Sequence, residues 1–277
     1  MSNRITAPAI IREVEAAGRS TPAAFGGGAI IGALGGLIGL GGAEFRLPLL
    51  IGAFRFAALQ AVILNKAMSL VVVASALPFR AAAVPFASVA AHWSIIVNLL
   101  AGSLLGAWFG ASWAIRLASH ALYRVIAVLL LGIAVVLALG HDTGPAASAM
   151  LTGPAQMIAG VAAGFGIGIV AALLGVAGGE LLIPTLVLLF GVDIKLAGSL
   201  SLAVSLPTML VGFARYSRDR SFVVLGQNRR FVLVMAAGSI FGSFIGGRLL
   251  GLVPSAVLLP LLAIILVLSA VKVWKHK

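Results

Sequence analysis

A ten-residue string occurs twice in this chain, at positions 136 residues apart. It reads GLGGAEFRLP at residues 39–48 and GVAGGELLIP at residues 175–184. At this offset two glycines, a glutamate and a proline of one copy align with those of the other. The match continues without a gap well past the string, for example from AGS at 101–103 to AGS at 237–239. A register kept over so long a distance indicates an internal duplication, and we expect two homologous halves.

The composition places the chain in a membrane. Of its 277 residues, 61% are hydrophobic and 9% are charged, whereas soluble globular chains carry about 25% charged residues. Cysteine is absent, which excludes disulfides, thiol catalysis and cysteine-based metal sites. The net charge of +12 comes mostly from Lys and Arg between apolar runs or at the termini. That distribution is typical of cytoplasmic loops, and no nucleic-acid partner is expected.

The apolar runs predict the number of membrane-spanning helices. A helix needs about 20 apolar residues to cross the hydrocarbon. Eight runs are long enough, at 24–42, 60–79, 93–113, 120–140, 156–176, 196–214, 231–250 and 254–273. Shorter apolar pieces at 45–57 and 181–192 follow the two copies of the string. Each begins near a proline, Pro48 or Pro184, which the first turn of a helix tolerates. We therefore predict an all-α polytopic membrane protein with 8–10 transmembrane helices in two homologous halves.

The same runs define the expected organisation of the chain. Residues 1–23 form a cytoplasmic N-terminal segment, whose Ile10, Ile11, Val14 and Ala17 suit a short helix lying along the membrane surface. The first repeat half spans 24–140, a polar linker spans 141–155, and the second half spans 156–273, followed by a tail at 274–277.

Whether the two short pieces cross the membrane decides the symmetry. If they cross, the halves are inverted repeats of five helices with a break at each glycine-rich string; if they do not, the halves are parallel repeats of four. Both schemes place the two termini on one side. The inverted scheme puts Arg55, Arg116 and Arg124 on the inner side, so the positive-inside rule favours it. The parallel scheme is the alternative.

The glycine-rich strings are expected to form the functional site. Irregular backbone at membrane depth is tolerated only where protein buries it or a wet cavity adjoins it. A break there leaves amide N–H groups free at the positive end of the next helix, where transporters bind anionic groups. The candidate amides are those of Gly41, Gly42, Gly178 and Gly179.

Three charged residues adjoin these breaks. Glu44 and Glu180 are two of only seven acidic residues in the chain. An acidic group inside a membrane is costly and suggests function, so each glutamate either caps the free amides or takes part in substrate or proton binding. Arg46 has no counterpart in the second half, where Leu182 stands. It either pairs with Glu44, meets an anionic substrate or extends to the membrane interface.

A second group of polar residues follows each short piece. Asn65 aligns with Ser201, and Ser69 aligns with Ser205. Residues four apart share a helix face, so each pair could line a transport path. The alternative is that these side chains hold transmembrane helices together. Lys66 would suit an anion or lie at headgroup level.

Patterns of other function classes are missing from the sequence. It contains no P-loop, no Ser-His-Asp pattern and no HExxH, and its four histidines have no metal-ligand spacing. We therefore expect no enzyme activity, no cofactor and no metal site.

The duplicated string resembles the hallmark of the TauE/SafE sulfite exporter family, also called the 4-toluene sulfonate uptake permease family. That hallmark is GxGGG followed by a proline, once in each half. Gly39, Gly41, Gly42 and Pro48 match the first copy, with Ala43 in place of the last glycine. Gly175, Gly178, Gly179 and Pro184 match the second, with Ala177 in place of the middle glycine. The resemblance implies transport of sulfite, sulfonates or related organosulfur anions, often export, across a bacterial inner membrane.

Together these features predict a multi-pass transporter or facilitator of small sulfur-containing anions, with both termini in the cytoplasm. Its partners would be a small anionic solute and the lipid bilayer, and a homo-oligomer is compatible with the sequence. The alternatives are an ion-coupled transporter of another small solute and a membrane scaffold without transport activity.

Overall fold

The computed structural model describes residues 20–38, 42–139, 149–249 and 255–275. Every regular element within these residues is a helix. The helices of the first half are α2 (Thr21–Ile38), α3 (Ala43–Gly52), α4 (Ala58–Ala83), α5 (Phe86–Ala91), α6 (Trp93–Arg116) and α7 (Ser119–Leu139). Those of the second half are α8 (Gly153–Leu174), α9 (Gly179–Phe190), α10 (Ile194–Tyr216), η2 (Arg220–Phe222), α11 (Val223–Gln227), α12 (Arg229–Leu249) and α13 (Ser255–Trp274).

Each run predicted from the sequence falls on a helix. The eight long runs correspond to α2, α4, α6, α7, α8, α10, α12 and α13, and the two short pieces correspond to α3 and α9. Five of the described helices are long and apolar enough to cross a membrane, and α2, α7, α9 and α13 contain shorter apolar stretches. The all-α polytopic membrane fold is therefore confirmed.

The helix ends differ by a few residues from the ranges expected from the sequence. The first residues of α2 lie in the stretch assigned to the N-terminal segment, and the start of α8 lies in the stretch assigned to the linker. Pro48 and Pro184 lie inside α3 and α9, beyond the first turn. Both short helices begin five residues before their proline, immediately after a glycine in the left-handed conformation. The proposed surface helix of the N-terminal segment lies outside the described residues.

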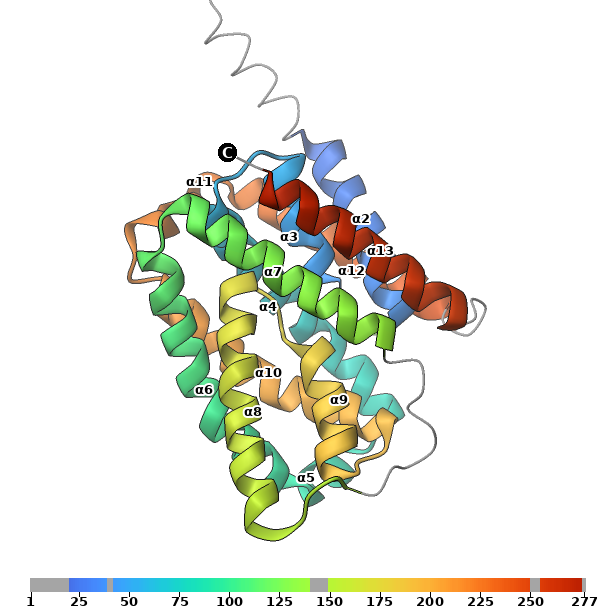
Figure 1. Cartoon of the computed structure of the whole chain (residues 1–277). Helices are drawn as coiled ribbons and strands as arrows, with labels where there is room; N and C mark the ends of the chain where they lie inside the picture. Colours follow the sequence, from blue (N-terminus) through green and yellow to red (C-terminus); the bar gives the residue numbers. More distant parts are fainter. Residues whose placement is uncertain (1–19, 39–41, 140–148, 250–254, 276–277) are drawn as a thin grey trace, which may run out of the picture.

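The helices of the two halves correspond one to one. The helices α3, α4, α6 and α7 begin 136 residues before α9, α10, α12 and α13, respectively. In Figure 1, α2 begins at the end of the molecule where α13 ends, whereas α8 begins at the opposite end. These two equivalent helices thus run in opposite directions, as the inverted scheme expects, and the symmetry of the remaining helices stays a prediction. How many of the helices cross the bilayer also stays a prediction.

The halves are interlocked, because the first helix of each packs chiefly against a helix of the other. The helix α2 lies against α12, and its counterpart α8 lies against α6. Glycines allow the backbones to approach closely at both contacts. A Cβ atom at Gly32 would collide with the carbonyl of Ser239, and one at Gly168 would collide with the equivalent carbonyl of Ser103.

The short helices lie inside the molecule. The helix α3 is buried on nearly all sides, and both glutamates, of α3 and α9, are buried. With 10 and 12 residues at 1.5 Å each, the two helices are about 15–18 Å long, or about half of the hydrocarbon thickness. The first residues of α3 and α9 therefore lie deep in the protein, at the points where the helical path is interrupted.

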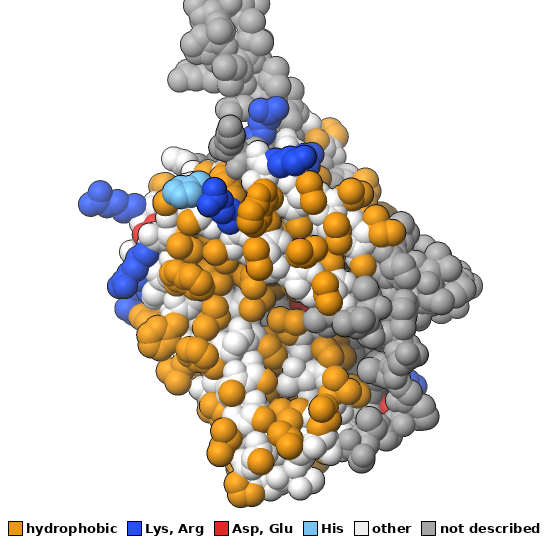
Figure 2. Space-filling view, viewed as in Figure 1, with side chains coloured by type: hydrophobic (Ala, Val, Ile, Leu, Met, Phe, Trp, Pro, Cys, Tyr) orange, Lys and Arg blue, Asp and Glu red, His pale blue; other side chains and the backbone are white. Residues whose placement is uncertain are grey.

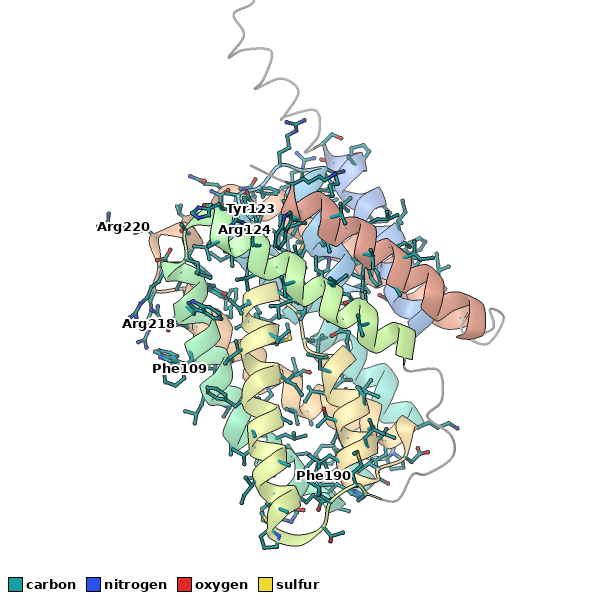
Figure 3. The ribbon with its side chains drawn as sticks, in the orientation of Figure 1. Phe109, Tyr123, Arg124, Phe190, Arg218 and Arg220 are labelled. Carbon is teal, nitrogen blue, oxygen red and sulfur yellow. The ribbon has the colours of Figure 1, made fainter. Side chains whose placement is uncertain are left out.

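Basic side chains gather at one end of the molecule. Figure 2 shows Lys and Arg at the end where α2 begins in Figure 1, and a mainly apolar surface over the rest of the described part of this face. Arg124, Arg218 and Arg220 belong to this end (Figure 3). The short helix α5, which connects α4 to α6, lies at the opposite end (Figure 1). This polarity matches the charge distribution that orients membrane proteins.

The glycine contacts predict a position-specific loss of stability. Gly166 and Gly168 both lie in α8, but a Cβ atom at Gly166 meets nothing within 4 Å. Replacing Gly168 with leucine should separate α8 from α6 and lower the free energy of unfolding by about 1–3 kcal/mol. Thermal unfolding of the purified protein in detergent measures this, with Gly166→Leu as the matched control. Equal changes in both variants would contradict the interlocked packing.

Candidate functional site

Both helix breaks depend on glycines with positive φ. Gly42 (φ 70°) precedes α3, Gly178 (φ 82°) precedes α9, and Gly175 (φ 68°) ends α8. Only glycine adopts this conformation without steric cost. The alanines that replace hallmark glycines, Ala43 and Ala177, do not have a positive φ. The two positions at which alanine replaces a hallmark glycine are therefore positions where the backbone does not require glycine. Gly41 lies outside the described residues.

Glu44 and Glu180 meet at the breaks. Each is the second residue of its short helix, and each side chain is almost fully buried. The carboxyl groups lie close enough to interact electrostatically with one another. Within the described residues their oxygens accept no hydrogen bond from any other side chain, but the two carboxyl groups lie close enough to share a proton, and each lies near the backbone amide of its own residue. The capping role and the binding role considered from the sequence both stay predictions for these side chains.

The proline of each short helix leaves one backbone carbonyl near the break without its usual helical partner. A proline has no N–H, so it cannot bond to the carbonyl four residues before it. For Pro48 and Pro184 those carbonyls belong to Glu44 and Glu180. The first two amides of each helix have no carbonyl within the helix to bond to, whereas those of Phe45 and Leu181 bond to the carbonyls of Gly42 and Gly178. Each break thus places the first amides of a helix, a carbonyl that lacks the usual N–H partner four residues later, and a carboxyl group in the protein interior.

Arg46 joins the first break to α4. Its side chain is fully buried, and its Nη1 donates to Asn65 Oδ1 (3.4 Å) and to Ser69 Oγ (3.3 Å). It also interacts electrostatically with Glu44. The structure therefore brings Glu44, Arg46, Asn65 and Ser69 together, and it excludes an interfacial position for Arg46.

Two α4 side chains bond to carbonyls near the C-terminal end of α8. Asn65 Nδ2 donates to the carbonyls of Ala43 (2.9 Å) and Leu174 (3.0 Å). Lys66 Nζ donates to the carbonyls of Ala171 (2.8 Å) and Val176 (3.0 Å). Such contacts suit the negative end of the α8 dipole. Lys66 is fully buried, which rules out the headgroup position considered from the sequence.

The second half contributes fewer polar contacts. Ser201 and Ser205 are buried in α10, and Ser201 Oγ donates to the carbonyl of Gly198 in its own helix. Leu182 and Leu202 stand where the first half has Arg46 and Lys66. The two cations of the site therefore come from one half, although each half supplies a glutamate.

An apolar layer adjoins the breaks. Val73, Ala177 and Met209 form a buried cluster from α4, the second break and α10. Leu70, Leu202 and Leu206 pack against it. Because Ala177 lies directly before Gly178, this apolar cluster reaches the second break.

Sequence reasoning missed one residue near the breaks. Tyr216, the last residue of α10, donates its hydroxyl proton to the carbonyl of Ala172 (3.0 Å) near the end of α8. The corresponding position in the first half is Arg80, so the repeat pattern carried no signal for it. A buried helix end needs donors, but only the fold shows which side chains supply them.

Comparisons with known proteins identify the family of the chain. Searches of curated proteins and of solved structures gave no match. A family model described as "Sulfite exporter TauE/SafE" matches residues 21–273, nearly the whole chain. It covers both glycine breaks and all ten long and short helices described above. The chain therefore belongs to the TauE/SafE sulfite exporter family, whose members are membrane transporters of sulfur anions such as sulfite.

Proposed function

We propose that this transporter exports sulfite or a related small sulfur anion through a site between the starts of α3 and α9. The observation that carries the proposal is the adjacent pair Glu44 and Glu180, buried side by side at two helix N-termini beside Arg46. The amides at the helix starts and the positive dipole ends of both helices favour an anion here. Arg46 adds a cation that can form two hydrogen bonds to one oxyanion.

The carboxyl pair sets a condition on anion binding. Two negative charges side by side in a buried site repel each other and would repel a third anion. A proton on the pair removes part of this repulsion. We therefore assign Glu44 and Glu180 the role of holding a proton while the anion occupies the site.

The membrane potential supports export rather than uptake. Moving one charge through 100 mV is worth about 2.3 kcal/mol, so a dianion that leaves a negative interior gains about 4–5 kcal/mol. Export therefore needs no coupling ion, whereas uptake would need one. We place the transporter in a bacterial inner membrane with the basic end and both termini on the cytoplasmic side.

The second candidate role of the Glu44 and Glu180 carboxyl groups is to bind a coupling cation in place of a proton. The carboxyl groups of Glu44 and Glu180 and the carbonyls freed by Pro48 and Pro184 are oxygen ligands of the kind that hard cations prefer. Flux that requires sodium, and that stops when choline replaces it, would favour this role over the proton.

Arg46 is predicted to be essential for transport. Arg46→Gln removes the buried cation and should lower sulfite efflux from proteoliposomes by at least about tenfold, since a hydrogen bond to a charged group is worth about 1.5–3 kcal/mol. Thr208→Val is the control, because its buried contact with Ser103 Oγ (2.7 Å) joins two other helices. Unchanged efflux in folded Arg46→Gln would contradict the anion site.

Glu44→Gln and Glu180→Gln are predicted to remove the pH dependence of transport. In the wild type, flux should fall as pH rises, because the pair loses its proton and repels the anion. A sulfonate substrate is the better probe, since its charge stays constant while that of sulfite changes. Asp193→Asn, at the exposed cap of α10, is the carboxylate control. An unchanged pH profile in both glutamine variants would exclude the proton role.

Single cysteines test the proposed orientation, because the chain has none of its own. A cysteine at exposed Arg116 should react with a membrane-impermeant thiol reagent only after the cells are opened. A cysteine at exposed Ala87, in α5 at the opposite end, should react in intact cells. The reverse pattern would overturn the cytoplasmic placement of the basic end.

A further inference from the structure

Two arginine side chains lie over one tryptophan ring on the outer face of α6. The guanidinium carbon of Arg215 is 5.6 Å from the centre of the Trp108 ring, and that of Arg218 is 5.2 Å from it. Both distances are within the range of cation–π contacts. Figure 3 shows Arg218 beside Phe109, at the flank of the molecule, while Arg220 projects away from it.

A hydrogen bond fixes the first of these arginines. Arg215 Nε donates to Ser112 Oγ at 2.7 Å, which ties the end of α10 to α6. Trp108, Ser112 and Arg116 follow each other at intervals of four, so they share one face of α6. Arg116 therefore adds a third positively charged side chain to this face of α6, one turn beyond Ser112. We call Trp108, Ser112, Arg215 and Arg218 the α6 arginine site.

The site has an excess of positive charge. Asp219 follows Arg218 in the chain, but its carboxylate accepts a hydrogen bond from the backbone N–H of Ser221 at 2.8 Å. Two guanidinium groups over one ring repel each other, because both carry a full positive charge. An anion that bonds to both would remove this repulsion.

The surface beside the site is apolar. Leu105 is 58% exposed and Phe109 is 59% exposed, although both lie on a membrane-length helix. In a membrane protein such a surface contacts lipid chains. Trp108 is 36% exposed and lies between this surface and the arginines, the position that tryptophan prefers at the boundary between headgroups and hydrocarbon.

We propose that the α6 arginine site binds the phosphate of an anionic phospholipid whose acyl chains lie along Leu105 and Phe109. The arginines supply paired donors for phosphate oxygens, and the apolar face of α6 supplies the contact for the chains. The site is separate from the proposed transport site and does not depend on the substrate. It would hold the end of α10 against α6 in the membrane.

Lipid-dependent stability and lipid retention test the proposal. The purified full chain is titrated with phosphatidylglycerol or phosphatidylcholine in detergent, thermal unfolding is followed, and bound lipid is counted by native mass spectrometry. Phosphatidylglycerol should stabilise the wild type and remain bound. Arg218→Gln should weaken its binding about fivefold, as expected for one arginine near an anionic headgroup. Trp108→Leu, which keeps the apolar surface, should also weaken binding.

Arg220→Gln is the matched control, because this exposed arginine begins the adjacent turn η2, and among the described residues only Arg215 and Arg218 lie over the Trp108 ring. It should retain the response of the wild type. Equal effects of Arg218→Gln and Arg220→Gln would overturn the proposal in favour of general charge attraction. Equal stabilisation by phosphatidylcholine would overturn it as well. Stabilisation by inorganic phosphate alone, to the same extent, would show a site for a soluble anion and would exclude the lipid.

Discussion

The fold depends on how it satisfies backbone groups at two helix breaks inside the protein. Water is excluded there, so every free carbonyl or amide is costly unless a partner is found. Asn65, Lys66 and Tyr216 supply the donors near the end of α8, and all three reach it from neighbouring helices. The break can therefore persist only when α4, α8 and α10 are packed together. This couples the shape of the candidate site to the packing of the whole bundle.

The first helix of each half packs against the other half. This packing also makes the shape of the candidate site depend on the whole bundle. Because α2 packs on α12 and α8 packs on α6, neither half buries its first helix by itself. The contacts of α7 with α13 join two equivalent helices of the two halves. The duplicated chain is thus one structural unit. A displacement of one half against the other would act directly on the breaks, where Glu44 and Glu180 meet.

The two halves share a backbone but differ in charge. Arg46 and Lys66 come from the first half, and leucines stand at the equivalent positions of the second. The glutamates are kept in both. Arg46 acts through hydrogen bonds to side chains, while Lys66 is bonded to backbone carbonyls. The shared elements therefore form the breaks, and the elements of one half alone determine where the positive charge of the candidate site lies.

The sequence by itself determined the membrane class, the duplication, the position of both breaks and the residues that surround them. Apolar runs, a constant offset and glycine–glutamate–proline strings are local signals, so they can be read without a fold. The partners of the side chains are not local. That Arg46 bonds to Asn65 and Ser69, that Lys66 binds the carbonyls near the α8 end rather than a headgroup, and that Pro48 lies inside its helix depended on packing between distant segments. Only the tertiary structure decided them, because buried polar groups take whichever partner the neighbouring helices bring within reach.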